Sequence, residues 1–270
     1  MFKLDSEGQQ VWDLSLGENK EEACYGIVVK DDGTIVATGI NASIGAGNQD
    51  MYLMKISADG QLIWDTVYGG PEFDTTKAVI QDSDGNIVVS GDSVSFGPGQ
   101  YNVWLLKYDQ AGNKLWDKVY GTESEEIGFD LTETSDGHYL IGGIWPGAVS
   151  NDFLLMKVDQ DGNEVWKTVF GGDFKEMGFG VAEHPEGGYL LAGKSTSPSQ
   201  NDSNFDLALA KVDSFSELEW ERYWQAGGND SFESVLVLPD GKIVAAGNTG
   251  GDGVIVLTDE RGYAPLTPKQ

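Results

Sequence analysis

A tryptophan recurs at an almost fixed interval along this chain, and this repeat constrains the fold more than any other feature. Successive members of the set are separated by 52, 52, 50 and 54 residues. Each lies in the same local pattern, in which an apolar run ending in a lysine leads through a turn to the tryptophan. A period of this length is typical of the blades of a β-propeller. The set consists of Trp12, Trp64, Trp116, Trp166 and Trp220.

Each repeat contains four short runs rich in β-branched and aromatic residues, and turn signals separate them. The pairs Asp84-Gly85 and Asp136-Gly137 are typical of tight hairpins. No helical period competes with this pattern. The sequence therefore predicts an all-β fold, a five-bladed β-propeller with four-stranded antiparallel blades. In the second blade the strands A to D are expected near residues 75–82, 86–92, 102–108 and 113–120.

The ends of the chain suggest how the ring of blades closes. The last repeat supplies three strand-like runs and then two prolines, which disfavour a fourth strand. Because an open sheet would leave an unpaired edge, we expect residues 9–16 to complete the last blade and close the ring. Phe2–Asp5 resemble a third strand and overlap 257–259, a pattern that a piece cut from a longer chain would give. We expect one domain over 1–270, with repeat units at about 18–69, 70–121, 122–171, 172–225 and 226–260.

The charge balance narrows the possible partners. The chain has 17 Lys and Arg against 44 Asp and Glu, a net charge of −27. Such a charge repels phosphate backbones and anionic lipids, so we expect no nucleic acid partner and no membrane insertion. Cations and basic molecules remain possible partners. The other interpretation is that the excess of acidic residues serves solubility alone. The single Cys24 cannot form an internal disulfide, and the start lacks the apolar core of a signal peptide. We expect a monomeric domain.

The string YGGPEFDTTKAVIQDSDGNIVVSG at 68–91, followed by NVWLLKYDQAGNKLW, resembles the bacterial β-propeller repeat of secreted and cell-surface proteins. The likeness covers nearly the whole chain, and blade five departs most, with Trp224-Gln225-Ala226 in place of Tyr-Gly-Gly. The resemblance implies a propeller fold and a secreted or cell-envelope setting, and it brings no catalytic residues. The residues that carry it best are Tyr68-Gly69-Gly70, Asp74, Asp84-Gly85-Asn86, Gly91, Lys107 and Asp109.

A first ring of acidic residues lies where each strand A is expected to begin. One interpretation is a site for a cation such as calcium, or for an amine, at the mouth of the central channel, because a cation relieves repulsion among crowded carboxylates. The other is that each carboxylate accepts backbone N–H bonds and holds the entry to strand A. The loop Asp82–Asn86 is not an EF-hand, because Ser93 stands where a bidentate Glu is required. The first ring consists of Glu22, Asp74, Glu126, Glu176 and Asp230.

A second ring of polar residues precedes strand C, five residues before a mid-strand lysine or, in the last repeat, before Leu257. We expect these lysines to form salt bridges or carbonyl contacts between blades, and the tryptophans to pack between blades. A glycine in each strand B indicates close packing or a bulge. The second ring is Asp50, Asn102, Asp152, Asp206 and Asp252; the lysines are Lys55, Lys107, Lys157 and Lys211; the glycines are Gly39, Gly91, Gly143, Gly193 and Gly247.

Binding is expected on the face formed by the B–C and D–A loops, because these loops vary in length and composition while the A–B and C–D turns are plain. Asp130 stands where other repeats carry a small residue, which makes it a candidate charge in the channel. His138 and His184 are expected to be surface histidines. The candidate contacts on the loop face are Phe73, Phe96, Tyr101, Trp145 and Phe174.

The leading hypothesis is therefore a non-enzymatic binding or interaction propeller that recognises a protein or a glycan through its loop face. A five-bladed glycosidase is the alternative from another class, and it would use two channel carboxylates in unlike environments. Five equivalent acids argue against it. A purely structural spacer within a larger protein is a third interpretation, and the sequence does not separate it from the first.

Overall fold

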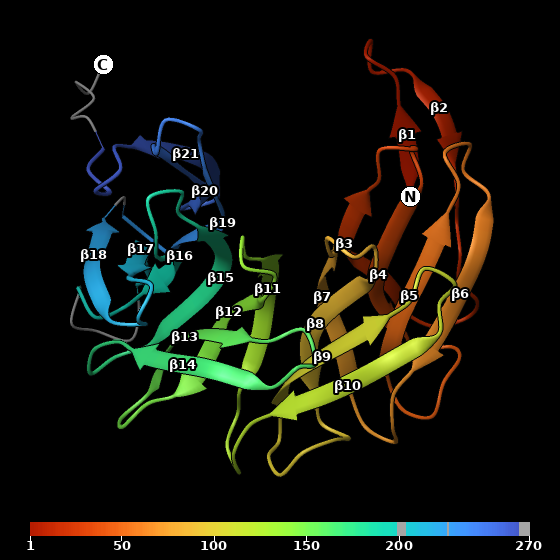
Figure 1. Ribbon diagram of the computed structural model, residues 1–270, viewed down its shortest axis with the longest axis horizontal. Coiled ribbons are helices and arrows are strands. Elements are labelled where there is room, and N and C mark those ends of the chain that lie inside the picture. The colour runs from red at the N-terminus through yellow and green to blue at the C-terminus, as the bar shows by residue number, and fades with distance from the viewer. Residues whose placement is uncertain (199–203, 226, 265–270) are drawn as a thin grey trace. The chain divides into compact units, whose positions relative to one another are not determined.

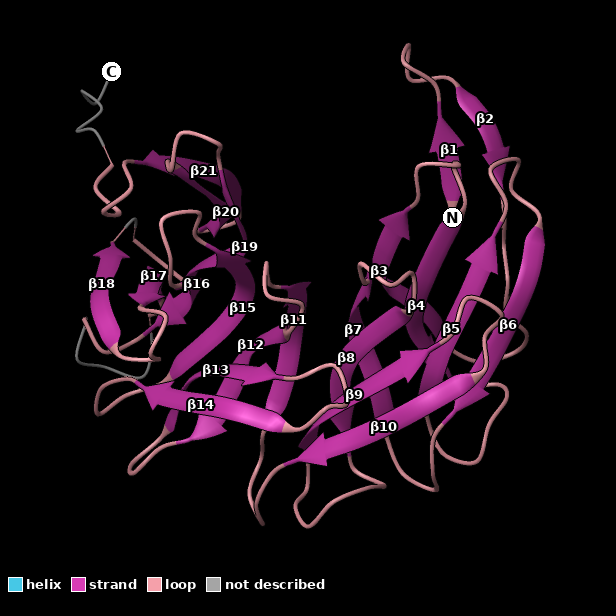
Figure 2. Cartoon of the chain, in the orientation of Figure 1, coloured by secondary structure: helices cyan, strands magenta, loops and turns pink. Residues whose placement is uncertain are grey.

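The computed structural model describes residues 1–198, 204–225 and 227–264, and all regular structure in these residues is β-strand (Figure 2). The described part contains no helix long and apolar enough to cross a membrane. The chain divides into two compact units, Met1–Gly128 and Phe129–Gln270. Each unit is described by itself below.

The first unit contains two four-stranded sheets and an N-terminal hairpin (Figure 1). The strands of each sheet follow one another in chain order, and every pair is antiparallel. Sheet I consists of β3 (Glu22–Val29), β4 (Ile35–Asn41), β5 (Asp50–Ile56) and β6 (Leu62–Tyr68). Sheet II consists of β7 (Asp74–Gln81), β8 (Ile87–Ser93), β9 (Asn102–Tyr108) and β10 (Lys114–Tyr120). The hairpin pairs β1 (Phe2–Leu4) with β2 (Gln10–Asp13).

The second unit holds the remaining sheets, apart from the first two residues of β11. Sheet III consists of β11 (Ile127–Glu133), β12 (Tyr139–Pro146), β13 (Asn151–Val158) and β14 (Glu164–Phe170). Sheet IV consists of β15 (Glu176–Glu183), β16 (Tyr189–Ser195), β17 (Asp206–Val212) and β18 (Leu218–Trp224). Sheet V has the three strands β19 (Asp230–Val237), β20 (Ile243–Thr249) and β21 (Asp252–Thr258). The predicted four-stranded antiparallel unit is confirmed, but six sheets are present among the described residues, so the count of five blades stays a prediction.

Residues 9–16, which are expected to close the ring, include β2, and β2 pairs with β1. Sheet V has three strands in the described part of the chain, and the closure of the ring by residues 9–16 stays a prediction. The short turn around Asp5 brings β2 beside β1 at little entropic cost. Two backbone N–H groups, of Glu7 and Gln9, donate to the Asp5 carboxylate and fix this turn.

The glycines of strand B allow a bulge in strand A, as the sequence predicted. The register of β7 on β8 shifts between Thr76 and Ala78, so Lys77 is an extra residue in the strand. A Cβ atom on Gly91 would lie 2.7 Å from Thr76 Cα and closer still to the Thr75 carbonyl oxygen. The same shift occurs in β3, β15 and β19, opposite Gly39, Gly193 and Gly247.

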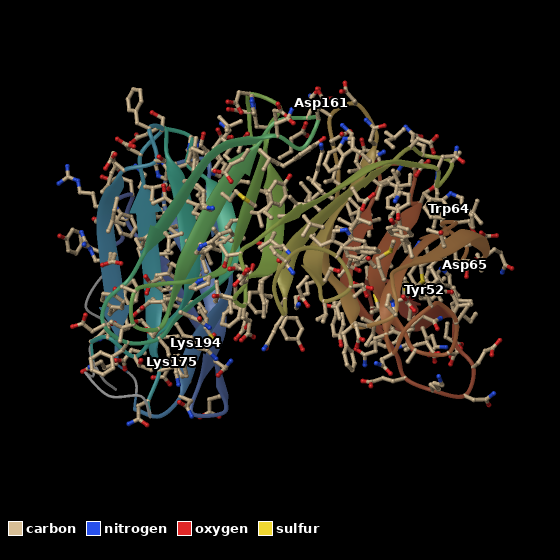
Figure 3. All side chains as sticks on the ribbon, turned by 90° about the horizontal axis from the view of Figure 1, so that it is seen from below. Tyr52, Trp64, Asp65, Asp161, Lys175 and Lys194 are labelled. Atoms are coloured by element: carbon tan, nitrogen blue, oxygen red, sulfur yellow. The ribbon has the colours of Figure 1, made fainter. Side chains whose placement is uncertain are left out.

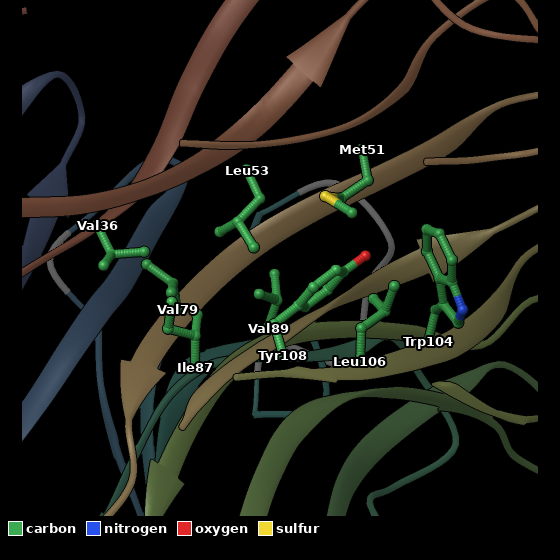
Figure 4. Packing of buried hydrophobic residues seen from close by; sticks show 9 residues of the cluster. All are labelled: Val36, Met51, Leu53, Val79, Ile87, Val89, Trp104, Leu106 and Tyr108. Carbon is green, nitrogen blue, oxygen red and sulfur yellow. The ribbon is translucent and has the colours of Figure 1, made fainter. Parts of the chain in front are cut away.

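The core of the first unit lies between sheets I and II, where side chains from β4, β5, β7, β8 and β9 interlock (Figure 4). The recurrent tryptophan lies at the outer edge of this interface and links the two sheets. Trp64 on sheet I donates its indole N–H to the Gln110 carbonyl of sheet II at 3.3 Å, and Trp12 contacts Ala58 in the same way at 3.2 Å. The expected packing of the tryptophans between neighbouring repeats is confirmed at these positions.

The mid-strand lysines have several kinds of partner. Lys55 donates to the Gln110 carbonyl in the next sheet at 3.2 Å, and Lys157 donates to the Tyr189 hydroxyl at 2.7 Å, so the predicted contact between repeats is present there. Lys107 instead pairs with Asp82 of its own sheet at 3.0 Å, and both side chains are buried.

Replacing Lys107 with methionine is expected to lower the free energy of unfolding by about 3 kcal/mol, because the Asp82 carboxylate would lose its buried counter-charge. Lys211→Met is the matched control, since its partner Glu219 is exposed and the expected loss is below about 1 kcal/mol. Guanidinium titration of the two variants measures both losses. Equal effects of the two substitutions would contradict the argument from burial.

Candidate functional site

The first acidic ring is largely buried, and Asp74, Glu126 and Glu176 accept hydrogen bonds from the chain itself. Asp74, Glu126, Glu176 and Asp230 have no exposed surface, and Glu22 is partly exposed. The Asp74 carboxylate accepts from the Gly70 N–H at 2.6 Å, the Ser95 N–H at 3.4 Å and the Ser93 hydroxyl. These contacts agree with the interpretation that the acids hold the entry to strand A. Direct binding of a ligand by the ring stays a prediction.

Glu126 and Glu176 are held by the same kind of donor. Glu126 accepts from the N–H and hydroxyl of Thr122, and Glu176 accepts from the Gly172 N–H at 3.3 Å and the Ser195 hydroxyl at 2.8 Å. Each carboxylate therefore ties the loop before strand A to its own sheet.

The second ring has an amide in one repeat and carboxylates in the others, and the hydrogen bonds differ accordingly. Asn102 uses its amide N–H groups to donate to the carbonyls of Ser93 at 3.3 Å and Phe96 at 3.1 Å. Asp50, which takes the equivalent place in sheet I, is 1% exposed and accepts from the Gly47 N–H at 3.1 Å, while its Oδ1 atom has no hydrogen-bond partner. Burial raises the pKa of Asp50, and the nearby Asp74 carboxylate raises it further.

A second pair of carboxyl groups meets in the second unit. Burial raises the pKa of both Asp152 and Glu176, and the charge of Asp152 raises that of Glu176 further. Within the described residues no cluster of three or more His, Cys, Asp or Glu side chains could hold a metal ion. The predicted cation at the acidic mouth stays a prediction. Calcium-dependent melting is the direct measurement.

The aromatic residues expected on the loop face divide into exposed and buried ones. Phe73 is exposed, and Tyr101 and Phe174 are half-buried. Phe96 instead packs inward, with its ring 5.9 Å from Tyr68 and stacked on it. Trp145 is 8% exposed and lies beneath the Lys167 ammonium group. The expectation of an exposed contact is corrected at Trp145, which is buried in β12, whereas Phe96 is half-buried and packs against the core between sheets I and II.

Asp130 is not a free charge, contrary to expectation. Its carboxylate accepts the backbone N–H of Val181 at 2.9 Å and so links β11 to β15. Burial raises the pKa of this carboxyl group.

His184 is likewise buried rather than on the surface, with its Nε2 atom 3.1 Å from the Gly241 carbonyl. A hollow of about 490 Å³ lies beside this histidine, among the A–B turns of the second unit. His138 is partly exposed and lies against Asp136. The interaction of His184 with Gly241 joins sheet IV to sheet V.

The residues that break the symmetry lie at the bulge of strand A, which the sequence reasoning missed. The bulge position varies between repeats, and so does the strand-B residue fifteen positions later. A tabulation of equivalent positions would have found this pair. The bulge residues are Tyr25, Lys77, Phe179 and Glu233, Phe129 stands at the equivalent position of the third repeat, and the strand-B residues are Ile40, Asp92, Ile144, Lys194 and Asn248.

In the second unit these positions form a group of unlike side chains, the inner-strand cluster, which consists of Phe129, Phe179, Lys194, Phe205 and Glu233. The Lys194 ammonium group lies 5.2 Å from the centre of the Phe179 ring and 4.5 Å from that of Phe205. Phe129 meets Phe179 edge to face at 4.9 Å. Burial lowers the pKa of Lys194, and the Glu233 charge opposes this shift.

At the equivalent positions of the first unit, two side chains pair with each other. Lys77 takes the place of Phe179 and forms an ion pair with Asp92, which takes the place of Lys194. Burial lowers the pKa of Lys77 to about 8. The two charges in the first unit therefore form an ion pair, whereas Lys194 in the second unit lies near two aromatic rings.

No known family model matches this chain, and no curated protein matches it in sequence. Solved structures do. A protein of unknown function from Bacteroides caccae is 16% identical, with a TM-score of 0.59 over 96% of this chain and 85% of that one. An exo-β-1,3-galactanase from Phanerochaete chrysosporium is 12% identical, with a TM-score of 0.53 over 99% of this chain and 65% of that one. An ulvan lyase is 14% identical, with a TM-score of 0.53 over 87% and 64%.

These neighbours are β-propeller-like proteins, so the likeness establishes a propeller-like all-β fold. The chain spans about two thirds of the length of the galactanase and of the lyase. At these levels of identity the comparison shows the fold alone and carries over no activity.

Proposed function

We propose that this chain is a non-enzymatic binding propeller of five blades, from an exported or cell-surface protein, which recognises a protein or a glycan through its B–C and D–A loops. The observation that carries the proposal is the contrast between a rigid base and exposed loop tips. Buried carboxylates such as Asp74 fix each loop from beneath. In the first unit Ile44 and Phe73 present apolar surface to solvent, and in the second unit Val149, in the loop between β12 and β13, is 75% exposed. Binding residues are commonly placed on loops that a rigid scaffold positions.

The hydrogen bonds of the first ring weigh against the glycosidase-like alternative. A general acid must reach the leaving oxygen of its substrate, and Glu126 and Glu176 are fully buried with their oxygens bound to hydroxyl and N–H donors. The spacer interpretation predicts no ligand at all, and the same experiment tests it.

A glycan array and binding assays against candidate envelope proteins test the proposal. The double variant Ile44→Ser, Phe73→Ser is expected to weaken binding through the first unit at least tenfold, because it removes the exposed apolar tips of that unit. Phe215→Ser is the matched control, since Phe215 is 81% exposed but lies in a C–D turn at the opposite end of its sheet. The absence of any ligand, or an equal loss in the control, would count against the loop face.

A further inference from the structure

The inner-strand cluster of the second unit has the composition of a binding site. No contact within it shows why smaller side chains would not serve the structure equally well. Phe129, Phe179, Lys194 and Phe205 are each half-buried, and Glu233 is exposed. Three sheets and one loop supply these five side chains. Small-ligand sites characteristically combine apolar and aromatic walls with a few convergent polar groups.

The charge on Lys194 is the unusual part of this cluster. Within the described residues no carboxylate forms an ion pair with it, whereas Lys77, Lys107 and Lys157 each have such a partner. The Lys194 ammonium group lies near two phenyl rings, and the nearest named charge that acts on it is that of Glu233. A half-buried cation gains most from an anion that completes its environment.

A second lysine lies at the same end of sheet IV. The backbone of Lys175 is tied to Thr196, two residues beyond Lys194, by the hydrogen bonds of the Thr196 N–H to the Lys175 carbonyl at 2.9 Å and of the Lys175 N–H to the Thr196 hydroxyl at 3.0 Å. Figure 3 shows both lysines at this end of the unit. Lys175 is exposed, and the acidic residues Glu176 and Asp206 lie at the same end of sheet IV, each opposite Ser195.

We infer that the inner-strand cluster binds a sugar that carries a carboxylate, a uronic acid residue, with the Lys194 ammonium group on the carboxylate. The phenyl faces of Phe179 and Phe205 receive the apolar face of the sugar ring. Glu233 and Asn248, which are 3.4 Å apart through the Asn248 amide and a Glu233 oxygen, accept from and donate to sugar hydroxyls. This inference rests on the proposed binding function and names its ligand class.

A uronic acid fits the cluster better than an acidic peptide does. A peptide rich in Asp or Glu would bring further carboxylates against Glu233 and against the overall negative charge, and it would offer few donors for the Glu233 oxygens. A sugar offers one carboxylate together with several hydroxyl donors. Binding of an acidic peptide in preference to the sugar would therefore overturn the inference.

Calorimetric titration with galacturonate and with its methyl ester tests this site, because esterification removes the charge of the single carboxylate and adds one methyl group. The unaltered protein is expected to bind the acid form at least tenfold more tightly than the ester. Lys194→Gln should remove this ratio, and Lys194→Arg should retain most of it, since both cations bind carboxylates. Phe179→Ala should weaken binding of both probes.

Lys167→Gln is the matched control, because Lys167 also lies over an aromatic ring, Trp145 at 3.7 Å, but belongs to β14 outside the cluster. It should leave the ratio unchanged. Equal binding of acid and ester by the unaltered protein overturns the inference even if every variant fails to fold. Binding of neutral glycans or a protein that depends on the loop tips alone would leave the proposed function standing, whereas no binding of any ligand would remove both.

Discussion

Gly91→Ala is expected to lower the free energy of unfolding by about 3 kcal/mol or more. The added Cβ would meet Thr76 Cα at 2.7 Å and the neighbouring carbonyl oxygen at a still shorter distance. Both obstacles are backbone atoms of the bulged strand β7, so no side-chain rotation relieves the clash. Guanidinium titration, followed by circular dichroism, measures the shift of the midpoint.

Gly253→Ala is the control, because Gly253 also lies in a strand yet has no atom within 4 Å of the added Cβ. Its expected effect is below about 0.5 kcal/mol. Gly193→Ala, at the same position of sheet IV, should reproduce the loss in the second unit. An unchanged midpoint for Gly91→Ala would mean that the bulge in β7 does not require the close approach of β8.

The repeat made much of this structure predictable, because equivalent positions in several copies reveal which residues the backbone requires. The second-blade strands were placed within about a residue of β7 to β10, and the strand-B glycines were correctly linked to close packing. Trp64 was correctly assigned to the interface between repeats for the same reason.

What the repeat could not predict depends on individual side chains and on the ends of the chain. Phe96 lies in a variable loop and Trp145 near the end of β12, and nothing in their sequence shows whether a ring turns into the core or out to solvent. The β1–β2 pair is a local hairpin that reasoning about ring closure did not place. Lys194 was missed because reasoning from symmetry draws attention to residues that recur in every repeat, and a lysine stands at this position in one repeat alone.

Asp50→Asn is expected to stabilise the protein at neutral pH by about 1 to 2 kcal/mol, because it replaces a buried, incompletely hydrogen-bonded carboxylate by an amide. The second repeat already shows the outcome, since Asn102 donates to two carbonyls from the equivalent position. The pKa of Asp50 is raised in the folded protein. Stability is therefore lost as pH rises from the ordinary aspartate pKa to the raised folded value, and the gain from the amide should be small in acid and complete at neutral pH.

Asp74→Asn separates this effect from a general benefit of removing acid. The Asp74 carboxylate accepts from two N–H groups and a hydroxyl, so an amide there leaves at least one donor unsatisfied, and the protein should lose about 1 to 3 kcal/mol. Thermal melting across pH, with and without calcium, measures both variants. A destabilised Asp50→Asn variant, together with calcium stabilisation of the unaltered protein alone, would mean that the Asp50 charge is needed for a cation. A stabilised Asp50→Asn variant would mean that an amide is the more stable choice at this position, as at Asn102, and that the charge of Asp50 lowers the stability of the protein.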